Sequence, residues 1–361
     1  MLQQRLNRLR KILKEKKLDA FLVSNFFNIL YLSGFKTLTE NEREAWMLIT
    51  SKNSYLFSDS RYLSEKIASD SPHNDITERL ITPEKALIKH LEEIFQEEKI
   101  KNCGVEEEDL KIGEFHSFIR YLKETKFFPA ERIIIKQREI KDEDEIKKIE
   151  KACEISDECL KETLRLIKVG KTEKEIAFKI EFWLKEKNYD LAFYPIIAIY
   201  ENSAIIHYDT RSGNNKKVKN DSLILIDFGT KYQNYLSDIT RMVFVGTPND
   251  DIVTTYNKLL NIQRNTVEKS KNNTICSELD LFCREKINYP HSTGHGVGLE
   301  IHEYPKISPV SKKRLLTNQV VTIEPGIYFE GKWGMRIEDT VLVKEKNAEP
   351  LTKFSKDLIV L

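Results

Sequence analysis

The sequence predicts a two-domain α+β protein, and three features of the 361-residue chain lead to that prediction. The chain is longer than a usual single domain. Its first third alternates helical and strand-like segments, which is typical of an α/β domain. The remainder begins with helices and then switches to paired apolar strands. We therefore expect an α/β domain at residues 1–128 and a larger domain, which would carry the chemistry, at residues 129–361.

The first domain has an amphipathic beginning and several short apolar runs. Residues 2–17 have helical periodicity, and a second helix is expected after Pro83, where leucine, isoleucine and phenylalanine recur at helical spacing. Strands are expected at 19–24, 45–49, 54–57 and, near the boundary, 133–135.

Two helices should open the second domain, because each begins with a capping-box pattern. Asp142 is followed by Glu145, and Thr172 is followed by Glu175. In such a box the first side chain accepts from the backbone of the third helical residue, and the acid returns the bond.

Two pairs of strands follow, at 223–229 with 238–245 and at 320–326 with 335–343. Each pair reads as a β-hairpin. The first contains Ile-Asp-Phe-Gly and the second Ile-Glu-Pro-Gly, so the hairpins are expected to be related by a pseudo-two-fold.

Acids interrupt both hairpins. Antiparallel pairing can place Asp227 opposite Asp238, and Glu324 opposite Glu338 with the turn centred on Gly331. Opposed Cβ atoms lie ~4.5–5.5 Å apart, so each pair would be strongly unfavourable in a buried site without a cation. The alternative for an isolated acid is an ion pair with a neighbouring arginine. Matched acids in two hairpins favour a metal site.

Histidines gather near the second hairpin. His291, His295 and His302 lie within twelve residues, in a glycine-rich segment, and His207 precedes the first hairpin. A lone histidine is usually structural, whereas this cluster favours a functional site.

Composition excludes several classes of function. The 58 basic and 57 acidic residues leave a formal net charge of +1, so no overall field favours nucleic acid or an anionic membrane. The charged N-terminus and the lack of a long apolar run predict an unexported, cytoplasmic protein without a membrane span. Five cysteines without a C-x-x-C pair argue against disulfides and thiolate zinc sites.

The sequence resembles the pita-bread metallopeptidases, in their branch of Xaa-Pro aminopeptidases and Xaa-Pro dipeptidases (prolidases). The N-terminal part resembles the creatinase/prolidase N-terminal domain, through Asn28-Ile-Leu-Tyr-Leu-Ser-Gly-Phe35 and Asp59-Ser-Arg-Tyr62. The C-terminal part carries five motifs in the family's order: Asn202-Ser-Ala with His207, Asp227-Phe-Gly, Ser237-Asp-Ile-Thr-Arg241, His291-Ser-Thr-Gly-His-Gly with His302-Glu, and Glu324-Pro-Gly with Arg336-Ile-Glu-Asp339.

The resemblance implies a role for each motif residue. Five side chains would bind two divalent ions: Asp227, Asp238, His295, Glu324 and Glu338. Glu324 would also shuttle the proton, His207 and His302 would hold the substrate, and His291 and Arg336 would support them. An oxygen-rich set with one imidazole suits Mn²⁺ best, with Co²⁺ or Zn²⁺ as alternatives.

The expected function is hydrolysis of the bond between an N-terminal residue and a following proline, as in an Xaa-Pro aminopeptidase. An Xaa-Pro dipeptidase is the alternative, because Lys306 occupies a position where dipeptidases can carry a basic residue for the substrate carboxylate. Ile206 replaces the usual proline before His207, so the substrate pocket can differ. A catalytically silent pita-bread binding module is the non-enzymatic alternative. Peptides with proline second are the expected partners, and relatives suggest a homodimer.

Overall fold

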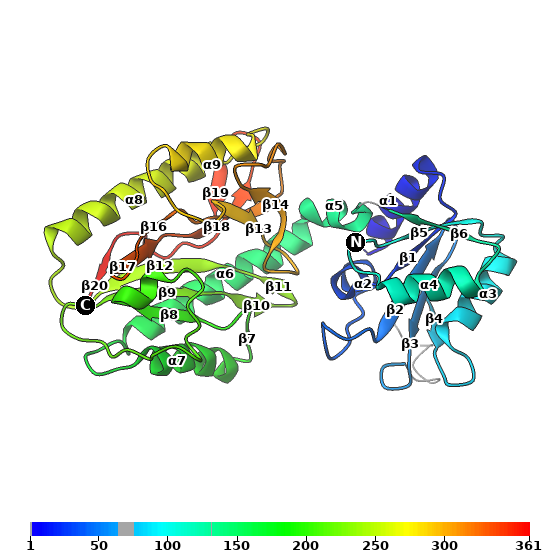
Figure 1. Ribbon diagram of the computed structural model, residues 1–361, viewed down its shortest axis with the longest axis horizontal. Coiled ribbons are helices and arrows are strands. Elements are labelled where there is room, and N and C mark those ends of the chain that lie inside the picture. The colour runs from blue at the N-terminus through cyan, green and yellow to red at the C-terminus, as the bar shows by residue number, and fades with distance from the viewer. Residues whose placement is uncertain (1, 64–75, 131) are drawn as a thin grey trace. The chain divides into compact units, whose positions relative to one another are not determined.

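The computed structural model describes residues 2–63, 76–130 and 132–361. Contacts within the chain divide it into two compact units, Met1–Arg138 and Glu139–Leu361, which are described separately (Figure 1). The division follows Arg138, whereas residue 128 is the expected end of the first domain. Arg138 explains the later position, because its guanidinium donates to Asn28 Oδ1 at 2.8 Å, within the first unit.

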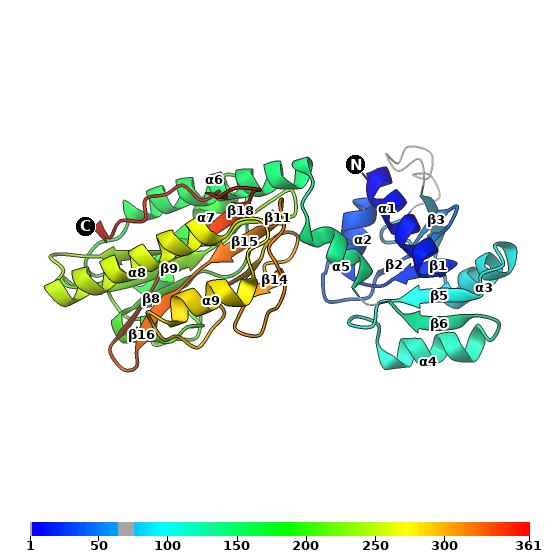
Figure 2. The same cartoon turned by 90° about the horizontal axis from the view of Figure 1, so that it is seen from above.

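The first unit is built on a six-stranded mixed sheet with the order β4-β3-β2-β1-β5-β6. In chain order its elements are α1 (Leu2–Glu15), β1 (Ala20–Val23), α2 (Phe26–Ser33), β2 (Ala45–Thr50), β3 (Ser54–Ser58), β4 (Thr77–Leu80), α3 (Leu87–Glu97), β5 (Asn102–Val105), α4 (Ile112–Tyr121), β6 (Lys126–Pro129) and α5 (Ile133–Glu139). Side chains of α3 and α4 share one apolar cluster with the sheet. Figure 2 shows α1 and α4 with the sheet between them.

The strand expected at residues 133–135 is wrong, because this segment is the helix α5. Ile133, Ile134, Gln137 and Arg138 are buried whereas Lys136 is exposed. Burial that recurs after four residues is the pattern of a helix with one packed face, and it overrides the β-propensity of three isoleucines.

The second unit combines the α-helices α6 to α9 with strands of two to six residues. In chain order its elements are α6 (Glu143–Leu164), α7 (Glu173–Glu186), β7 (Asp190–Leu191), β8 (Ile196–Ile199), the 3₁₀ helix η2 (Tyr200–Ala204), β9 (Leu223–Phe228), β10 (Thr230–Tyr232), β11 (Tyr235–Leu236), β12 (Ile239–Phe244), α8 (Asp250–Lys269), α9 (Cys276–Arg284), β13 (Gly294–Gly296), β14 (Glu303–Ile307), β15 (Val320–Ile323), β16 (Gly326–Phe329), β17 (Trp333–Arg336), β18 (Asp339–Val343), β19 (Ala348–Pro350) and β20 (Ile359–Val360).

Helices cover the two main sheets of this unit, whose strand orders are β20-β12-β9-β8 and β14-β13-β15-β18-β19. Alternate side chains of β9 and β12 enter two clusters, one with α6 and α7 and the other with α8. A further cluster joins the end of α8 and α9 to β15 and β18. Because side chains alternate between the two clusters, both faces of the β20-β12-β9-β8 sheet are buried. This burial fixes the direction of each side chain along β9 and β12.

Both capping boxes are confirmed. Asp142 accepts from the backbone N–H of Glu145, whose side chain accepts from the N–H of Asp142, and Thr172 and Glu175 make the corresponding pair of bonds. These bonds satisfy N–H groups that the first turn of a helix leaves free. Neither α8 nor α9, which follow the first hairpin, was expected from the sequence.

The first hairpin does not have the expected register. Asp227 lies opposite Thr240, not Asp238. The reason is a two-residue turn, Gln233-Asn234, in which both residues have positive φ, 46° and 71°. Such a turn matches the twist of the flanking strands, and it shifts the pairing by two residues from the expected one.

The second hairpin has the expected register. Ile323 pairs with Asp339 and Gly326 pairs with Arg336, so the intervening Glu324 and Glu338 fall opposite one another. Its turn contains Gly331 with φ of 70°, a conformation that glycine adopts without steric cost.

Two features bear on the environment of the chain. All five cysteines are free and buried. Among the residues that the structure describes, no helix is both long and apolar enough to cross a membrane.

Candidate active site

A cavity of about 430 Å³ in the second unit gathers the residues that the sequence analysis selected. All nine line it: His207, Asp227, Asp238, His291, His295, His302, Glu324, Arg336 and Glu338. They come from the loop after η2, both hairpins and the segment that includes β13. Lys306 and Ile206 line the same cavity. The fold therefore brings together residues that are more than a hundred positions apart.

Three side chains form a compact group in this cavity. Ligand atoms of Asp238, His295 and Glu338 all lie within 4.8 Å of one another. Asp238 directly precedes β12, and Glu338 directly precedes β18. The backbone N–H of Glu338 donates to the carbonyl of Thr240 at 3.2 Å, so one isolated bridge joins the two hairpins at the group.

The acids of this group repel one another. Burial raises the pKa of Asp238 well above its ordinary value, and the carboxylates of Glu338 and Asp227 raise it further. The pKa of Glu338 is raised well above its ordinary value by burial and then by Glu324 and Asp227. Burial also raises the pKa of Glu324, to about 7. The ionised carboxylates therefore need additional positive charge.

Two carboxylate oxygens in the cavity have no hydrogen-bond donor. Asp227 Oδ1 and Asp238 Oδ1 are buried and without a partner among the described residues. A buried carboxylate oxygen normally accepts a hydrogen bond or coordinates a metal. Both residues line the cavity, and their orphaned oxygens fit a cation that prefers oxygen ligands.

His295 presents a free nitrogen to the acids. Its Nδ1 lies 3.1 Å from the carbonyl of Gly296, which makes Nδ1 the protonated nitrogen. Its Nε2 lies 3.7 Å from Asp238 Oδ2 and 3.4 Å from Glu324 Oε1. Burial lowers the pKa of His295 to about 3, with His302 as the second cause, so the ring is neutral. A lone pair that faces carboxylate oxygens fits a shared cation.

Asp227 has a different environment from Asp238. The guanidinium of Arg336 donates through Nη2 to Asp227 Oδ2, and both side chains are almost completely buried. Arg336 comes from β17, so this ion pair links the second hairpin to the first. Asp227 thus has one oxygen compensated by arginine and one oxygen available.

Tyr328 and Thr240 complete the site. Tyr328 was not among the residues expected from the sequence, and Thr240 was recognised only as part of the Ser237–Arg241 motif, without a role. Tyr328 OH lies 2.9 Å from His291 Nε2 and accepts from Arg336 Nη1 at 3.0 Å. Thr240 Oγ1 donates to Glu338 Oε2 at 2.6 Å. The signal for Tyr328 was its spacing of four from Glu324, since residues at even spacing along extended backbone share a face.

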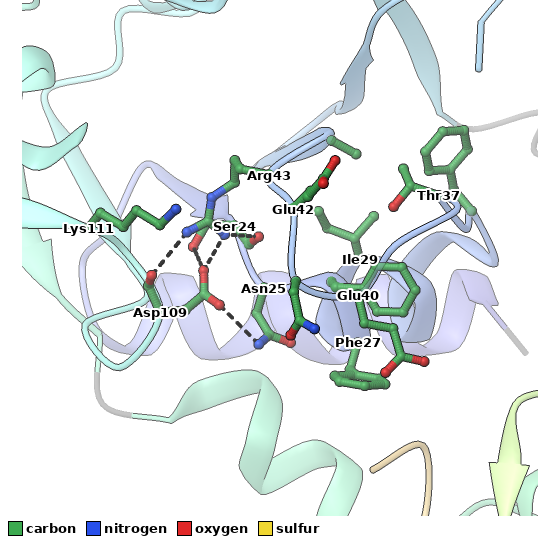
Figure 3. Close-up of a pocket in the computed structure, with 14 residues that line it drawn as sticks. Ser24, Asn25, Phe27, Ile29, Thr37, Glu40, Glu42, Arg43, Asp109 and Lys111 are labelled. Carbon is green, nitrogen blue, oxygen red and sulfur yellow. Dashed lines mark hydrogen bonds and ion pairs between the residues drawn. The ribbon is translucent and has the colours of Figure 1, made fainter. Parts of the chain in front are cut away.

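The first unit contains another cavity, of about 220 Å³ (Figure 3). Arg43 donates there to the carbonyl of Ser24 and to the carboxylates of Asp109 and Glu114. These charged groups satisfy one another. In the described part of the chain, the group in the second unit is the one cluster of three or more side chains placed to hold a metal ion.

Comparisons with known proteins identify the family of this chain. Residues 147–345 match metallopeptidase family M24, and residues 5–140 match the creatinase/prolidase N-terminal domain. A Pyrococcus horikoshii protein named Xaa-Pro dipeptidase is 33% identical over 99% of this chain and 99% of its own length.

Solved structures with a similar fold come from the same group of peptidases. The Xaa-Pro dipeptidase from Bacillus anthracis covers 100% of both chains with 30% identity and a TM-score of 0.90. The X-Pro aminopeptidase from Thermotoga maritima covers 96% of this chain and 98% of its own, with 34% identity and a TM-score of 0.85. The expected α+β fold, with a creatinase-like N-terminal domain and a pita-bread C-terminal domain, is confirmed. The chain belongs to metallopeptidase family M24, and is thus a hydrolase of a family that works with divalent metal ions.

Proposed function

We propose that this protein is an Xaa-Pro dipeptidase, which hydrolyses a dipeptide with proline as its second residue. This choice reverses the order of the sequence analysis, which placed an Xaa-Pro aminopeptidase first. The names of the Pyrococcus horikoshii and Bacillus anthracis relatives support the dipeptidase better. The Thermotoga maritima structure keeps an aminopeptidase as the competing outcome.

Lys306 is the observation that carries the proposal. It lines the cavity with the acids and lies opposite His295 in the pairing of β13 with β14. Among the described residues, no carboxylate forms an ion pair with Lys306. A dipeptide places its free carboxylate one residue from the scissile bond, within reach of a cation beside the reacting groups. A longer peptide has an amide at that position and gains nothing from the lysine.

The metal ligands in this proposal are the five residues of the sequence analysis, with Mn²⁺ as the first choice. The compact group supplies Asp238, His295 and Glu338. Asp227 adds its free oxygen, and Glu324 adds an oxygen close to His295. When bound, divalent ions supply an activated water nucleophile and polarise the scissile carbonyl.

The side chains around this group account for the other steps. Hydrolysis adds hydroxide to the carbonyl carbon and a proton to the departing proline nitrogen. Glu324 takes the proton and delivers it in this proposal, because its carboxylate lines the cavity, with Oε1 3.4 Å from His295 Nε2. His207 and His302 line the cavity and hold the substrate. Burial lowers the pKa of His302, so its ring is a neutral hydrogen-bonding partner.

The test is a comparison of Ala-Pro with Ala-Pro-Ala as substrates of the Mn²⁺-loaded protein. We expect cleavage of the dipeptide and little or none of the tripeptide. Lys306→Met should raise the KM for Ala-Pro by ~10–100-fold, the range expected for loss of one charged hydrogen bond. Lys312→Met, at an exposed lysine, is the matched control and should leave the KM unchanged. Efficient cleavage of Ala-Pro-Ala, with no effect of Lys306→Met, would support the aminopeptidase instead.

A further inference from the structure

Glu173, the first residue of α7, is a fully buried carboxylate outside the cavity described above. Its two oxygens accept four hydrogen bonds. Oε1 accepts from the backbone N–H of Ile199 and from Asn202 Nδ2, both at 2.7 Å. Oε2 accepts from Tyr208 OH at 2.8 Å and from the backbone N–H of Lys216 at 2.9 Å.

All four donors belong to one stretch of chain, residues 199–216, which includes η2 and the loop that follows it. In the described part of the chain, no lysine or arginine forms an ion pair with Glu173. The negative charge is therefore stabilised by these four donors and by the N-terminal end of α7. Four bonds use essentially the whole accepting capacity of a carboxylate, so Glu173 fixes the loop at several points at once.

The fixed stretch carries a residue of the candidate active site. Tyr208 is buried and holds Glu173, whereas the adjacent His207 is exposed to the cavity. On the other side of the stretch, Ser203 Oγ accepts from the backbone N–H of Gly334 at 2.8 Å. A Cβ at Gly334 would lie 2.3 Å from the carbonyl of Ser203, so β17 approaches η2 as closely as the backbone allows. The loop is thus held from both sides with His207 at the cavity.

We propose that Glu173 is a positioning residue for His207. Its carboxylate organises the 199–216 loop so that the imidazole of His207 stands at the substrate end of the cavity. The substrate-holding role of His207 rests on the proposed function above. Glu173 itself touches neither the substrate nor the metal ligands, and it acts through Tyr208 and Asn202. The proposal also gives a structural reason for the Asn202 motif, because Asn202 is one of the four donors.

Glu173→Gln tests the proposal, because glutamine keeps the size but turns an NH₂ group toward two of the donors. We expect a kcat/KM for Ala-Pro that is lower by ~10²-fold, the loss that a displacement of about 1 Å can cause. The loss should fall mainly on KM, and the bound metal should be unchanged, since the proposed ligands lie on other elements. Glu175→Gln is the matched control: Glu175 is exposed two residues further on, and glutamine also serves in a capping box.

A double-mutant cycle separates positioning from general destabilisation. In a His207→Ala background, Glu173→Gln should lower kcat/KM by less than ~2-fold, because both changes remove the same interaction. Losses that multiply in the double mutant would overturn the proposal, as would a Glu173→Gln variant with wild-type kinetics. If Glu173→Gln does not fold, Tyr208→Phe replaces it in the cycle, since it removes one of the four donors and keeps the ring.

Hydrogen exchange provides a readout that does not depend on the substrate. In Glu173→Gln, peptides from residues 199–216 should exchange faster than in the wild type, and those from 223–244 should not change. Unchanged exchange in 199–216 would overturn the positioning role. The two proposals can fail separately. If the wild-type protein cleaves no Xaa-Pro dipeptide but Glu173→Gln still exchanges faster in residues 199–216, the proposed function is refuted and the anchoring of the loop by Glu173 stands.

Discussion

The two β-hairpins that carry the acids have similar sequences and different structures. In the second, Glu324 and Glu338 face each other in the register that the sequence predicts. In the first, the Gln233-Asn234 turn shifts the pairing, so Asp227 faces Thr240. A resemblance of four residues between hairpins therefore does not carry over to their register, which depends on the length and conformation of each turn.

The two acids of the first hairpin, Asp227 and Asp238, lie in different charge environments. Asp227 forms an ion pair with Arg336, although burial still raises its pKa, whereas Asp238 lies among other carboxylates. Asp238 also has a buried oxygen without a donor, as does Asp227. The need for a cation therefore depends on the surroundings of each acid. It is greatest at Asp238, because Glu338 of the second hairpin and His295 lie beside it.

The largest expected effect on stability comes from replacing Asp227 and Asp238, one at a time, in the metal-free protein. Asp227→Asn breaks a buried ion pair and should lower the free energy of unfolding by about 3–5 kcal/mol. Asp238→Asn removes repulsion among the buried carboxylates and should raise the free energy of unfolding at about pH 8. Thermal unfolding in the presence of a chelator measures both. Two shifts of the same sign would mean that the two aspartates do not differ as described.

Glu324→Gln tests the proton transfer assigned to the second hairpin. It should lower kcat for Ala-Pro by at least ~10²-fold, a typical contribution of a general acid and base. The bound metal must be measured in parallel, because Glu324 is also a proposed ligand. Near-normal turnover in a metal-loaded variant would remove Glu324 from this role.

The stability of the metal-free protein should fall as pH rises above about 6.5. Above this value the raised pKa values of Glu324, Asp238 and Glu338 mean that the folded state binds more protons than the unfolded state, so stability falls as pH rises. Below it, His291 and His295 oppose the acids, because their pKa values of about 4 and about 3 lie under the ordinary 6.5 and the unfolded state binds more protons.

We expect the Tm of the metal-free protein to fall by several °C between about pH 6.5 and about pH 8.5. Saturating Mn²⁺ should stabilise most at the upper end of this range, where the ligands are deprotonated. Scanning calorimetry across this pH range makes the measurement. A Tm that is flat or rises with pH in the chelated protein would contradict the burial of ionised acids.

The smallest effect concerns the turn that sets the first register. Asn234→Val places a β-branched residue at φ of 71° and should lower the free energy of unfolding by about 1–2 kcal/mol. Asn234→Gly adopts this conformation freely and serves as the control, with little change expected. Denaturant unfolding of both variants checks the prediction, and a valine variant as stable as the glycine variant would argue against a strained turn.

Much of this structure could be predicted from local patterns. The capping boxes of α6 and α7 depend on residues three positions apart, and apolar periodicity located the strands that carry the acids. The nine site residues follow from motif order and all line one cavity.

What could not be predicted depends on tertiary packing and backbone conformation. Helix α5 overrides the strand propensity of its isoleucines because one face of the helix is buried. The shifted register required the φ angles of Gln233 and Asn234, which no spacing rule supplies. Tyr328 and Glu173 act through partners that are distant in sequence, so only the fold reveals their hydrogen bonds.

The most direct test of the account is the metal content of the purified, Mn²⁺-loaded protein, measured by elemental analysis for the wild type and for Asp238→Asn. We predict two ions per wild-type chain and a clear loss in the variant, because Asp238 lies in the compact group of ligand atoms. Wild-type protein without bound metal, or an Asp238→Asn variant that keeps both ions, would contradict a metal site at the meeting point of the two hairpins.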